Sequence, residues 1–250
     1  MTRPYRIGQI VPSSNITMET EIPAMLTARQ HVRPERFTFH SSRMRMKTVA
    51  REELASMDAQ SDRCALELSD AAVDVMGYAC LVAIMSMGPG YHRESQQRLR
   101  RVTAENGAET AVVNSAGALV DALEVMNARR VVVVAPYMKP LTEMVVNYIR
   151  EEGIDVRDYR ALEIPDNLAV ARHDPDNLPA IVASMDLSEV DAIVLSACVQ
   201  MPSLPAVAKV EAMTGKPVVT AAIATTYAML KSLGLEPVVP GAGALLSGAY

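Results

Sequence analysis

The sequence predicts an α/β fold made of two similar lobes. Short apolar runs alternate with segments of helical periodicity along the 250-residue chain, a pattern typical of parallel strands joined by crossover helices. The pattern restarts near the middle, and half of the residues are hydrophobic, which is enough for a large core. We therefore expect two pseudo-symmetric Rossmann-like lobes, each with a mostly parallel four-stranded sheet flanked by helices. The active site is expected in the cleft between them.

The first half of the chain contains four predicted strands, each a short apolar or β-branched run. They are expected at residues 7–11, 36–40, 73–79 and 111–113. Apolar residues recurring at three or four positions predict the helices between them. These helices are expected at residues 18–28, 52–70, 91–105 and 116–126, the last with Ser115 as its N-cap. Residues 85–90, which contain two glycines and a proline, are expected to form a loop near the cleft.

The second half repeats this order of elements. It begins with a strand at residues 131–135, whose four valines and one alanine indicate burial on both faces. Further strands are expected at 154–161, 190–197 and 217–219, with helices at 141–151, 177–185, 204–213 and 221–233. The predicted N-terminal lobe is residues 1–115, completed by 221–250, and the C-terminal lobe is residues 116–220.

Two cysteines close matching segments in the two halves. Cys80 and Cys198 each end a run that begins Val-Asp, continues apolar and finishes Ala-Cys. Their positions differ by about half the chain length, so duplicated lobes would bring both to the carboxyl ends of strands, where ligands bind in open α/β sheets. A lone buried cysteine is more often a small core residue, which is how we interpret Cys64. The pairing favours a two-thiol active site, with N–H groups after Cys80 stabilising a thiolate.

Polar residues follow other predicted strands and are candidates for binding a carboxylate. Asn15 lies just after the first strand, Tyr137 after the valine-rich strand and Asn167 after the strand at 154–161. The alternative roles are a helix N-cap for Asn15, an amphipathic interface residue for Tyr137 and a turn residue for Asn167. On sequence alone these alternatives stay open.

Composition argues against several classes of function. The net charge is −5, and no basic stripe with interleaved aromatic residues is present, so we expect no nucleic-acid partner. No apolar run reaches the roughly 20 residues that span a bilayer, and no signal-type segment is found, so a cytoplasmic protein without membrane contact is expected. Three cysteines fit a reducing compartment. The four histidines and three cysteines form no metal-ligand spacing, so no metal is expected.

Several segments together resemble maleate cis-trans isomerases of the aspartate/glutamate racemase superfamily. The resemblance covers essentially the full length and is carried by residues 11–15, 77–83, 134–138, 164–168 and 195–200. Amino-acid racemases of the superfamily usually have a Cys-Asn-Thr-like turn, whereas Cys80 is followed by Leu81 and Val82. Relatives similar to arylmalonate decarboxylase keep one of the two cysteines, and this chain keeps both.

The resemblance implies isomerisation of maleate to fumarate without a cofactor. Cys80 would add to the double bond as a thiolate, which requires a lowered thiol pKa, and Cys198 would deliver and later remove a proton. The implied substrate-binding side chains are Asn15, Tyr137 and Asn167. The backbone groups of Leu81, Val82, Val199 and Gln200 would also bind the substrate. A homodimer and a role in nicotinate degradation are also implied. The alternatives are a two-cysteine amino-acid or hydantoin racemase and a non-catalytic protein that binds a small ligand.

Overall fold

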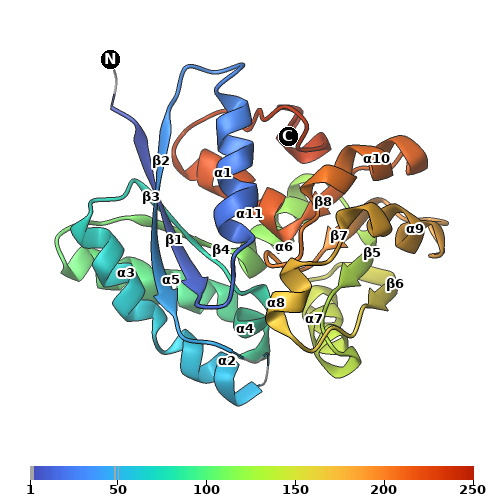
Figure 1. The fold of residues 1–250 in the computed structure, drawn as a ribbon, viewed down its shortest axis with the longest axis horizontal. Helices are drawn as coiled ribbons and strands as arrows, with labels where there is room; N and C mark the ends of the chain where they lie inside the picture. Colours follow the sequence, from blue (N-terminus) through green and yellow to red (C-terminus); the bar gives the residue numbers. More distant parts are fainter. Residues whose placement is uncertain (1–2, 48, 50) are drawn as a thin grey trace.

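The computed structural model describes residues 3–47, 49 and 51–250, and within these ranges the strands form two four-stranded parallel sheets (Figure 1). The strand order is β2-β1-β3-β4 in the first sheet and β6-β5-β7-β8 in the second. The second order is the first with every strand number raised by four, so β3 and β7 are equivalent. The expected α/β fold with two similar sheets is confirmed.

The first sheet and its helices come from the first half of the chain. The elements are β1 Tyr5–Pro12, α1 Met18–Arg29, β2 Phe37–Met44, α2 Arg51–Asp58, α3 Ser61–Asp70, β3 Val75–Tyr78, α4 Leu81–Ser86, α5 Tyr91–Glu105, β4 Ala111–Asn114 and α6 Ser115–Val125. Strands β3 and β4 pair along their full lengths, with Tyr78 opposite Asn114. This register aligns the carboxyl ends of the two strands at one edge of the sheet.

The second sheet is built in the same way. Its elements are β5 Arg130–Ala135, α7 Lys139–Glu151, β6 Asp155–Ala161, α8 Asn167–Ala171, the 3-10 helix η1 Pro175–Asn177, α9 Leu178–Ala183, β7 Ala192–Ser196, α10 Leu204–Thr214, β8 Val218–Thr220, α11 Ala221–Ser232 and the 3-10 helix η2 Ala244–Leu246. From Val131 to Ala135, β5 is completely buried, as its unbroken apolar composition predicts.

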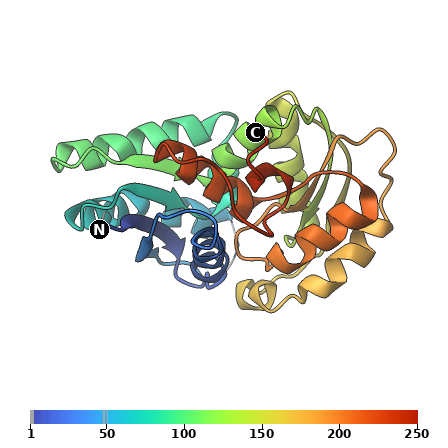
Figure 2. The same ribbon diagram turned by 90° about the horizontal axis from the view of Figure 1, so that it is seen from above.

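The last long helix joins the two halves. Helix α11 packs against α6, α1, β3 and β4, all of which precede residue 126. Seen from above, the two lobes lie side by side, and the C-terminal segment returns between them (Figure 2). Helix α11 therefore contacts the first sheet although it follows the second in sequence. The division into lobes at residues 115 and 220 stays a prediction.

The prediction of a single helix at residues 52–70 is wrong, because the chain turns at residues 59 and 60 and forms two helices, α2 and α3. Side-chain hydrogen bonds stabilise this turn: the Ser61 hydroxyl donates to the Asp58 carbonyl at 2.6 Å, and the Gln60 side chain accepts the Arg45 N–H from the end of β2 at 3.0 Å. A turn held by such polar bonds leaves little trace in the apolar spacing, which is similar in the two helices.

Two other sequence-based expectations differ from the structure. The N-cap of α6 is Asn114, not Ser115: Asn114 has an extended backbone, and its side chain accepts the Gly117 N–H at 2.7 Å. Met85 and Ser86, expected in a loop, form the end of the short helix α4. Helix α4 begins directly after Cys80 and matters for the site described below.

An ion pair between the buried Asp58 and the partly exposed Arg98 lies beneath the end of β3. The Asp58 carboxylate accepts hydrogen bonds from the Tyr78 and Tyr91 hydroxyls at 2.7 and 2.6 Å and from the Arg98 guanidinium at 3.0 Å. Asp58 is only 2% exposed. A carboxylate buried to this extent needs its counter-ion, because water cannot replace it.

The substitution Arg98→Met is expected to lower the free energy of unfolding by roughly 3 kcal/mol, since it strands the Asp58 charge in the interior. Lys209→Met is the control, because it removes one partner of an exposed ion pair with Asp176 and should change stability little. Urea denaturation of both variants measures the difference. Equal loss from the two substitutions would contradict this assignment.

None of the helices in the described part of the chain is both long and apolar enough to cross a membrane.

Candidate active site

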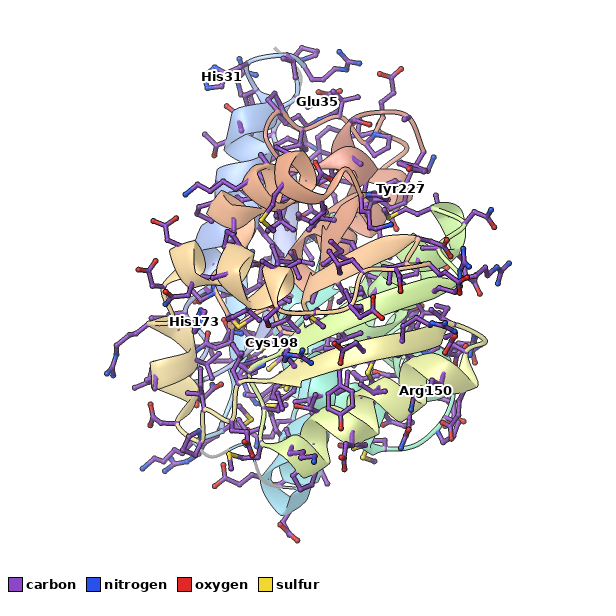
Figure 3. The ribbon with its side chains drawn as sticks, turned by 90° about the vertical axis from the view of Figure 1, so that its right-hand side faces the viewer. His31, Glu35, Arg150, His173, Cys198 and Tyr227 are labelled. Carbon is purple, nitrogen blue, oxygen red and sulfur yellow. The ribbon has the colours of Figure 1, made fainter. Side chains whose placement is uncertain are left out.

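A small cavity lies where strands from both sheets end at their carboxyl termini. Cys80 follows β3 and Cys198 follows the equivalent strand β7, and both thiols line the cavity. Figure 3 places Cys198 at one end of the strands of the second sheet. The cavity wall contains all nine residues singled out from the sequence, namely Asn15, Cys80, Leu81, Val82, Tyr137, Asn167, Cys198, Val199 and Gln200. The structure thus brings together every candidate, while their individual roles stay predictions.

The rest of the wall was not anticipated from the sequence. Pro12, Met46 and Val49 complete the lining with apolar surface. Strand β2 runs to Met44, four residues beyond the expected end, so the chain after it reaches the same sheet edge as the thiols. Residues 41–43 are all polar, so the alternation of polar and apolar residues stops at residue 40 and gives no signal of this longer strand.

The cavity is small. A volume of about 20 Å³ is enough for roughly one water molecule. Larger hollows lie between α4 and α7 and beside the C-terminus, but in the described residues neither is lined by a cysteine. The enclosed space between the thiols is therefore the candidate active site.

Cys80 has an unusual backbone conformation. Its φ and ψ are 101° and 72°, in the left-handed region that residues with a side chain rarely adopt. It lies at the turn from β3 into α4 and is 8% exposed. Strain of this kind persists only when the surrounding structure holds it, and it is concentrated at functional sites. Here it directs the side chain of Cys80 into the cavity at the start of a helix.

Cys198 is held by its own loop rather than by a strained backbone. The Gln200 N–H donates to the Cys198 sulfur at 3.4 Å, and the Ser196 hydroxyl donates to the Cys198 carbonyl at 2.8 Å. The Tyr137 hydroxyl donates to the Ala197 carbonyl at 3.0 Å, which brings the phenol close to Cys198. The two thiols therefore lie in equivalent places but in different surroundings.

Burial dominates the ionisation of both thiols. It raises the pKa of Cys80 to about 12, and the Ala83 N–H, which favours the thiolate, counters it only in part. The pKa of Cys198 is also raised by burial, against hydrogen bonds from Tyr137 and the Gln200 N–H that lower it. The lowered pKa expected at Cys80 is therefore not found in this structure, because burial raises it. Burial of Cys80 removes most of the water that would stabilise a thiolate.

This pKa makes an alkylation experiment informative. At pH 8 the free protein is expected to react with iodoacetamide at Cys80 much more slowly than a small free thiol, because the neutral thiol predominates and it is buried. The rate should rise through the alkaline range as the thiolate forms. Peptide mass spectrometry at several pH values measures it. A midpoint below pH 9 would show that the site lowers the pKa of Cys80 instead. Slow alkylation is thus expected of an enzyme as well, so it does not distinguish an enzyme from a non-catalytic protein that binds a small ligand.

Unpaired backbone donors lie next to both cysteines. Among the described residues, no acceptor is found for the N–H groups of Leu81, Val82 and Val199. The first N–H groups of a helix have no partner within it, which accounts for Leu81 and Val82 at the start of α4. Buried N–H groups are nearly always hydrogen-bonded, so free ones that line a cavity are available to an anionic ligand.

The three polar candidates also reach the cavity, each through a defined contact. The Asn15 side chain accepts the Met18 N–H at 3.0 Å, which leaves its amide nitrogen without an acceptor among the described residues. The Asn167 amide donates to the Ser14 hydroxyl at 2.7 Å, and the turn role is performed by Asp166, which caps α8. Tyr137 is 6% exposed, so it is not a surface residue. A ligand with carboxylates would find amide, phenol and N–H donors here.

Within the described residues, no group of three or more His, Cys, Asp or Glu side chains is arranged to hold a metal ion. The acceptor-rich clusters that metal sites need are therefore not found next to the thiols, and the donors around them favour an anion.

Comparisons with known proteins agree with this geometry. Residues 7–246 match the arylmalonate decarboxylase family. A maleate isomerase of Pseudomonas putida strain KT2440 is 79% identical over 250 residues, the full length of both chains. The structure of a cysteine-to-alanine variant of a maleate isomerase from Pseudomonas putida S16, solved with maleate, is 70% identical with a TM-score of 0.98 and covers 99% of each chain. A cysteine-to-serine variant of Nocardia farcinica maleate cis-trans isomerase, with a covalently bound succinylcysteine intermediate, is 49% identical with a TM-score of 0.95, covering 99% of this chain and 100% of that chain.

Proposed function

Since the chain belongs to the maleate isomerase family of cis-trans isomerases, we propose that it converts maleate to fumarate through a covalent adduct on Cys80. The observation that carries the proposal is the pair of buried thiols in one closed cavity lined by unpaired donors. The maleate bound to one relative and the succinylcysteine in another support the substrate and the type of intermediate.

The first step is addition of the Cys80 thiolate to one alkene carbon of maleate. A carbon–sulfur bond forms, the double bond becomes single, and its electron pair moves to the other carbon and into the adjacent carboxylate. The Cys198 thiol then donates its proton to that carbon. The product is a succinyl group on Cys80 and a thiolate on Cys198.

The second half of the reaction reverses these bonds in a new rotamer. The central bond of the succinyl group rotates, because it is now single. The Cys198 thiolate removes a proton from the same carbon, the electron pair re-forms the double bond, and the carbon–sulfur bond breaks. Fumarate leaves, and Cys80 and Cys198 return to their starting protonation states, so no cofactor is consumed.

The assignment of the nucleophile to Cys80 rests on local geometry. Cys80 is the thiol on the strained turn, with the free N–H groups of Leu81 and Val82 beside it. Those donors, with Asn15, Asn167 and Tyr137, are suited to binding the two carboxylates and the negative charge that develops on addition. Because burial favours the neutral thiol, Cys80 must release its proton to water before the carbon–sulfur bond forms, and it regains a proton after fumarate leaves.

The environment of Cys80 also separates this proposal from racemisation. Leu81 and Val82 supply neither the amide nor the hydroxyl side chain of a Cys-Asn-Thr turn, so the racemase alternative has no specific support. The homodimer, the cytoplasmic location and the role in nicotinate degradation stay predictions from the family resemblance.

Proton NMR tests the proposed reaction directly. Purified protein with reduced thiols, without added metal or nucleotide, is expected to convert the alkene signal of maleate into that of fumarate. Absence of fumarate at high protein concentration would refute the proposal. Exchange of an α-proton of aspartate or a hydantoin with solvent deuterium, without maleate turnover, would favour the racemase alternative instead.

A further inference from the structure

The side chain of Gln200 joins segments that are far apart in the sequence. Its amide oxygen accepts the N–H groups of Ile16 and Thr17 at 2.9 and 3.3 Å, and its amide nitrogen donates to the carbonyls of Ser14 and Asn167 at 2.8 and 2.9 Å. Gln200 itself is 2% exposed. We refer to these contacts as the Gln200 bridge.

The bridge uses the hydrogen-bonding capacity of the side chain. A carboxamide has two acceptor lone pairs and two N–H donors, and the Gln200 bridge occupies all of them with described residues. The side chain therefore has no group left for a substrate carboxylate. Only the backbone of Gln200 remains a candidate for substrate binding, and the side chain needs another explanation.

Each end of the bridge lies next to a residue of the site. Two residues bonded to the Gln200 side chain, Ser14 and Ile16, flank Asn15. The Asn167 carbonyl accepts a hydrogen bond from the Gln200 amide, and the Asn167 side-chain amide donates to the Ser14 hydroxyl. On the other side, the Gln200 N–H donates to the Cys198 sulfur. The bridge thus connects the proton-carrying thiol with both asparagines.

We propose that Gln200 is a positioning residue that keeps the Cys198 thiol aligned with a substrate bound by Asn15 and Asn167. The inference rests on the proposed function, since it assigns to Gln200 the alignment of the proton-transferring thiol. Proton transfer to and from carbon requires close and directed approach, and a misplacement of about 1 Å can cost on the order of 10²-fold in rate. A single buried amide with all its bonds made supplies that alignment across the lobes.

A second contact anchors the far end of the same loop. Glu21 accepts the N–H groups of Ser203 and Leu204 at 2.6 and 2.7 Å, and so links α1 to the start of α10. The loop that carries Cys198 is thereby tied to the first lobe at Ser203 and again at Gln200. Loss of the Gln200 bridge should consequently displace Cys198 without unfolding the loop.

The test compares Gln200→Met with Gln9→Met. Methionine has a similar length and makes none of the four bonds. Gln9 is a buried glutamine in β1 that bonds only the Ser41 hydroxyl among the described residues, so its substitution controls for removing a buried amide elsewhere. Gln200→Met is expected to lower kcat by about 10²-fold, more than it raises KM, and to accumulate the succinyl adduct on Cys80 in quenched samples. Gln9→Met should retain wild-type kcat.

A second variant adds a signature that a structural defect would not produce. In Gln200→Glu one oxygen still accepts the Ile16 and Thr17 N–H groups, but the other faces the Ser14 and Asn167 carbonyls. Protonation of this carboxylate restores one donor, so the deficit in kcat relative to wild type should shrink as the pH falls. A deficit that is independent of pH would overturn the inference, as would wild-type kcat for Gln200→Met.

Alkylation of Cys198 gives a readout that does not depend on maleate turnover. Loss of the bridge should weaken the Gln200 N–H contact with sulfur and shift the alkylation midpoint of Cys198 to higher pH. If the wild-type protein produced no fumarate, the proposed function would fail. The alkylation midpoint of Cys198 would still show whether Gln200 positions that thiol. A shift in Gln200→Met alone supports the bridge, and equal midpoints in Gln200→Met and Gln9→Met overturn it.

Discussion

Replacing Cys80 by alanine is expected to lower kcat for maleate isomerisation by on the order of 10⁴-fold or more. Without the thiolate no carbon–sulfur bond forms, and the central bond of maleate stays double. The remaining donors proposed to bind the dicarboxylate, Leu81 and Val82 N–H among them, are retained, so the affinity for maleate should change much less than kcat. Initial rates followed by proton NMR, with maleate binding measured by calorimetry, separate the two effects.

Cys64→Ala is the matched control for this substitution. Cys64 is completely buried in α3, and it does not line the cavity. Its loss removes a small core side chain, which affects stability rather than the reaction. The account fails if Cys64→Ala and Cys80→Ala reduce kcat equally.

Replacing Cys198 by serine is expected to lower kcat by on the order of 10³-fold, because a general acid or base in the transition state typically contributes a factor of 10² to 10⁴. The serine hydroxyl is a far weaker acid than a thiol and is a poor source and acceptor of the proton. Addition to Cys80 does not need the sulfur of Cys198, and the proton that completes the succinyl group can come from water, so the covalent adduct should still form. Single-turnover measurements are expected to show fast binding followed by slow release of fumarate.

The two cysteine variants are distinguished by what each retains. Cys80→Ala should form no covalent species at any time, whereas Cys198→Ser should form one and release it slowly. If Cys198→Ser retained full turnover, the proton carrier would have to be another group, and Tyr137 would be the first to test because its hydroxyl lies beside Cys198.

The architecture and the position of the thiols follow from short-range patterns in the sequence. Buried parallel strands are continuous apolar runs, so β5 and β7 are visible in the composition alone. The repeated Val-Asp to Ala-Cys run places Cys80 and Cys198 on equivalent strands, and the matching sheet orders agree with that reading. Asn15, Tyr137 and Asn167 were candidates because they lie in the loops that follow predicted strands. The backbone groups of Leu81, Val82, Val199 and Gln200 were implied by the family resemblance instead.

The remaining features depend on tertiary contacts. The left-handed conformation of Cys80 has no signal in a sequence where only glycine marks such positions reliably. Helix α4 is six residues long, too short for its periodicity to be recognised. The raised pKa of Cys80 comes from burial by segments distant in sequence, Met46 and Tyr137 among them. The Gln200 bridge spans more than 180 residues, a separation that local patterns do not encode.

Mass spectrometry of the Cys198→Ser protein quenched after incubation with maleate tests the central claim most directly. The account predicts a mass increase equal to one succinyl group, located on the peptide that contains Cys80 and lost in the double variant Cys80→Ala, Cys198→Ser. An adduct on any other residue would contradict covalent addition by Cys80. Fumarate formation by the Cys198→Ser protein without any adduct would contradict it as well.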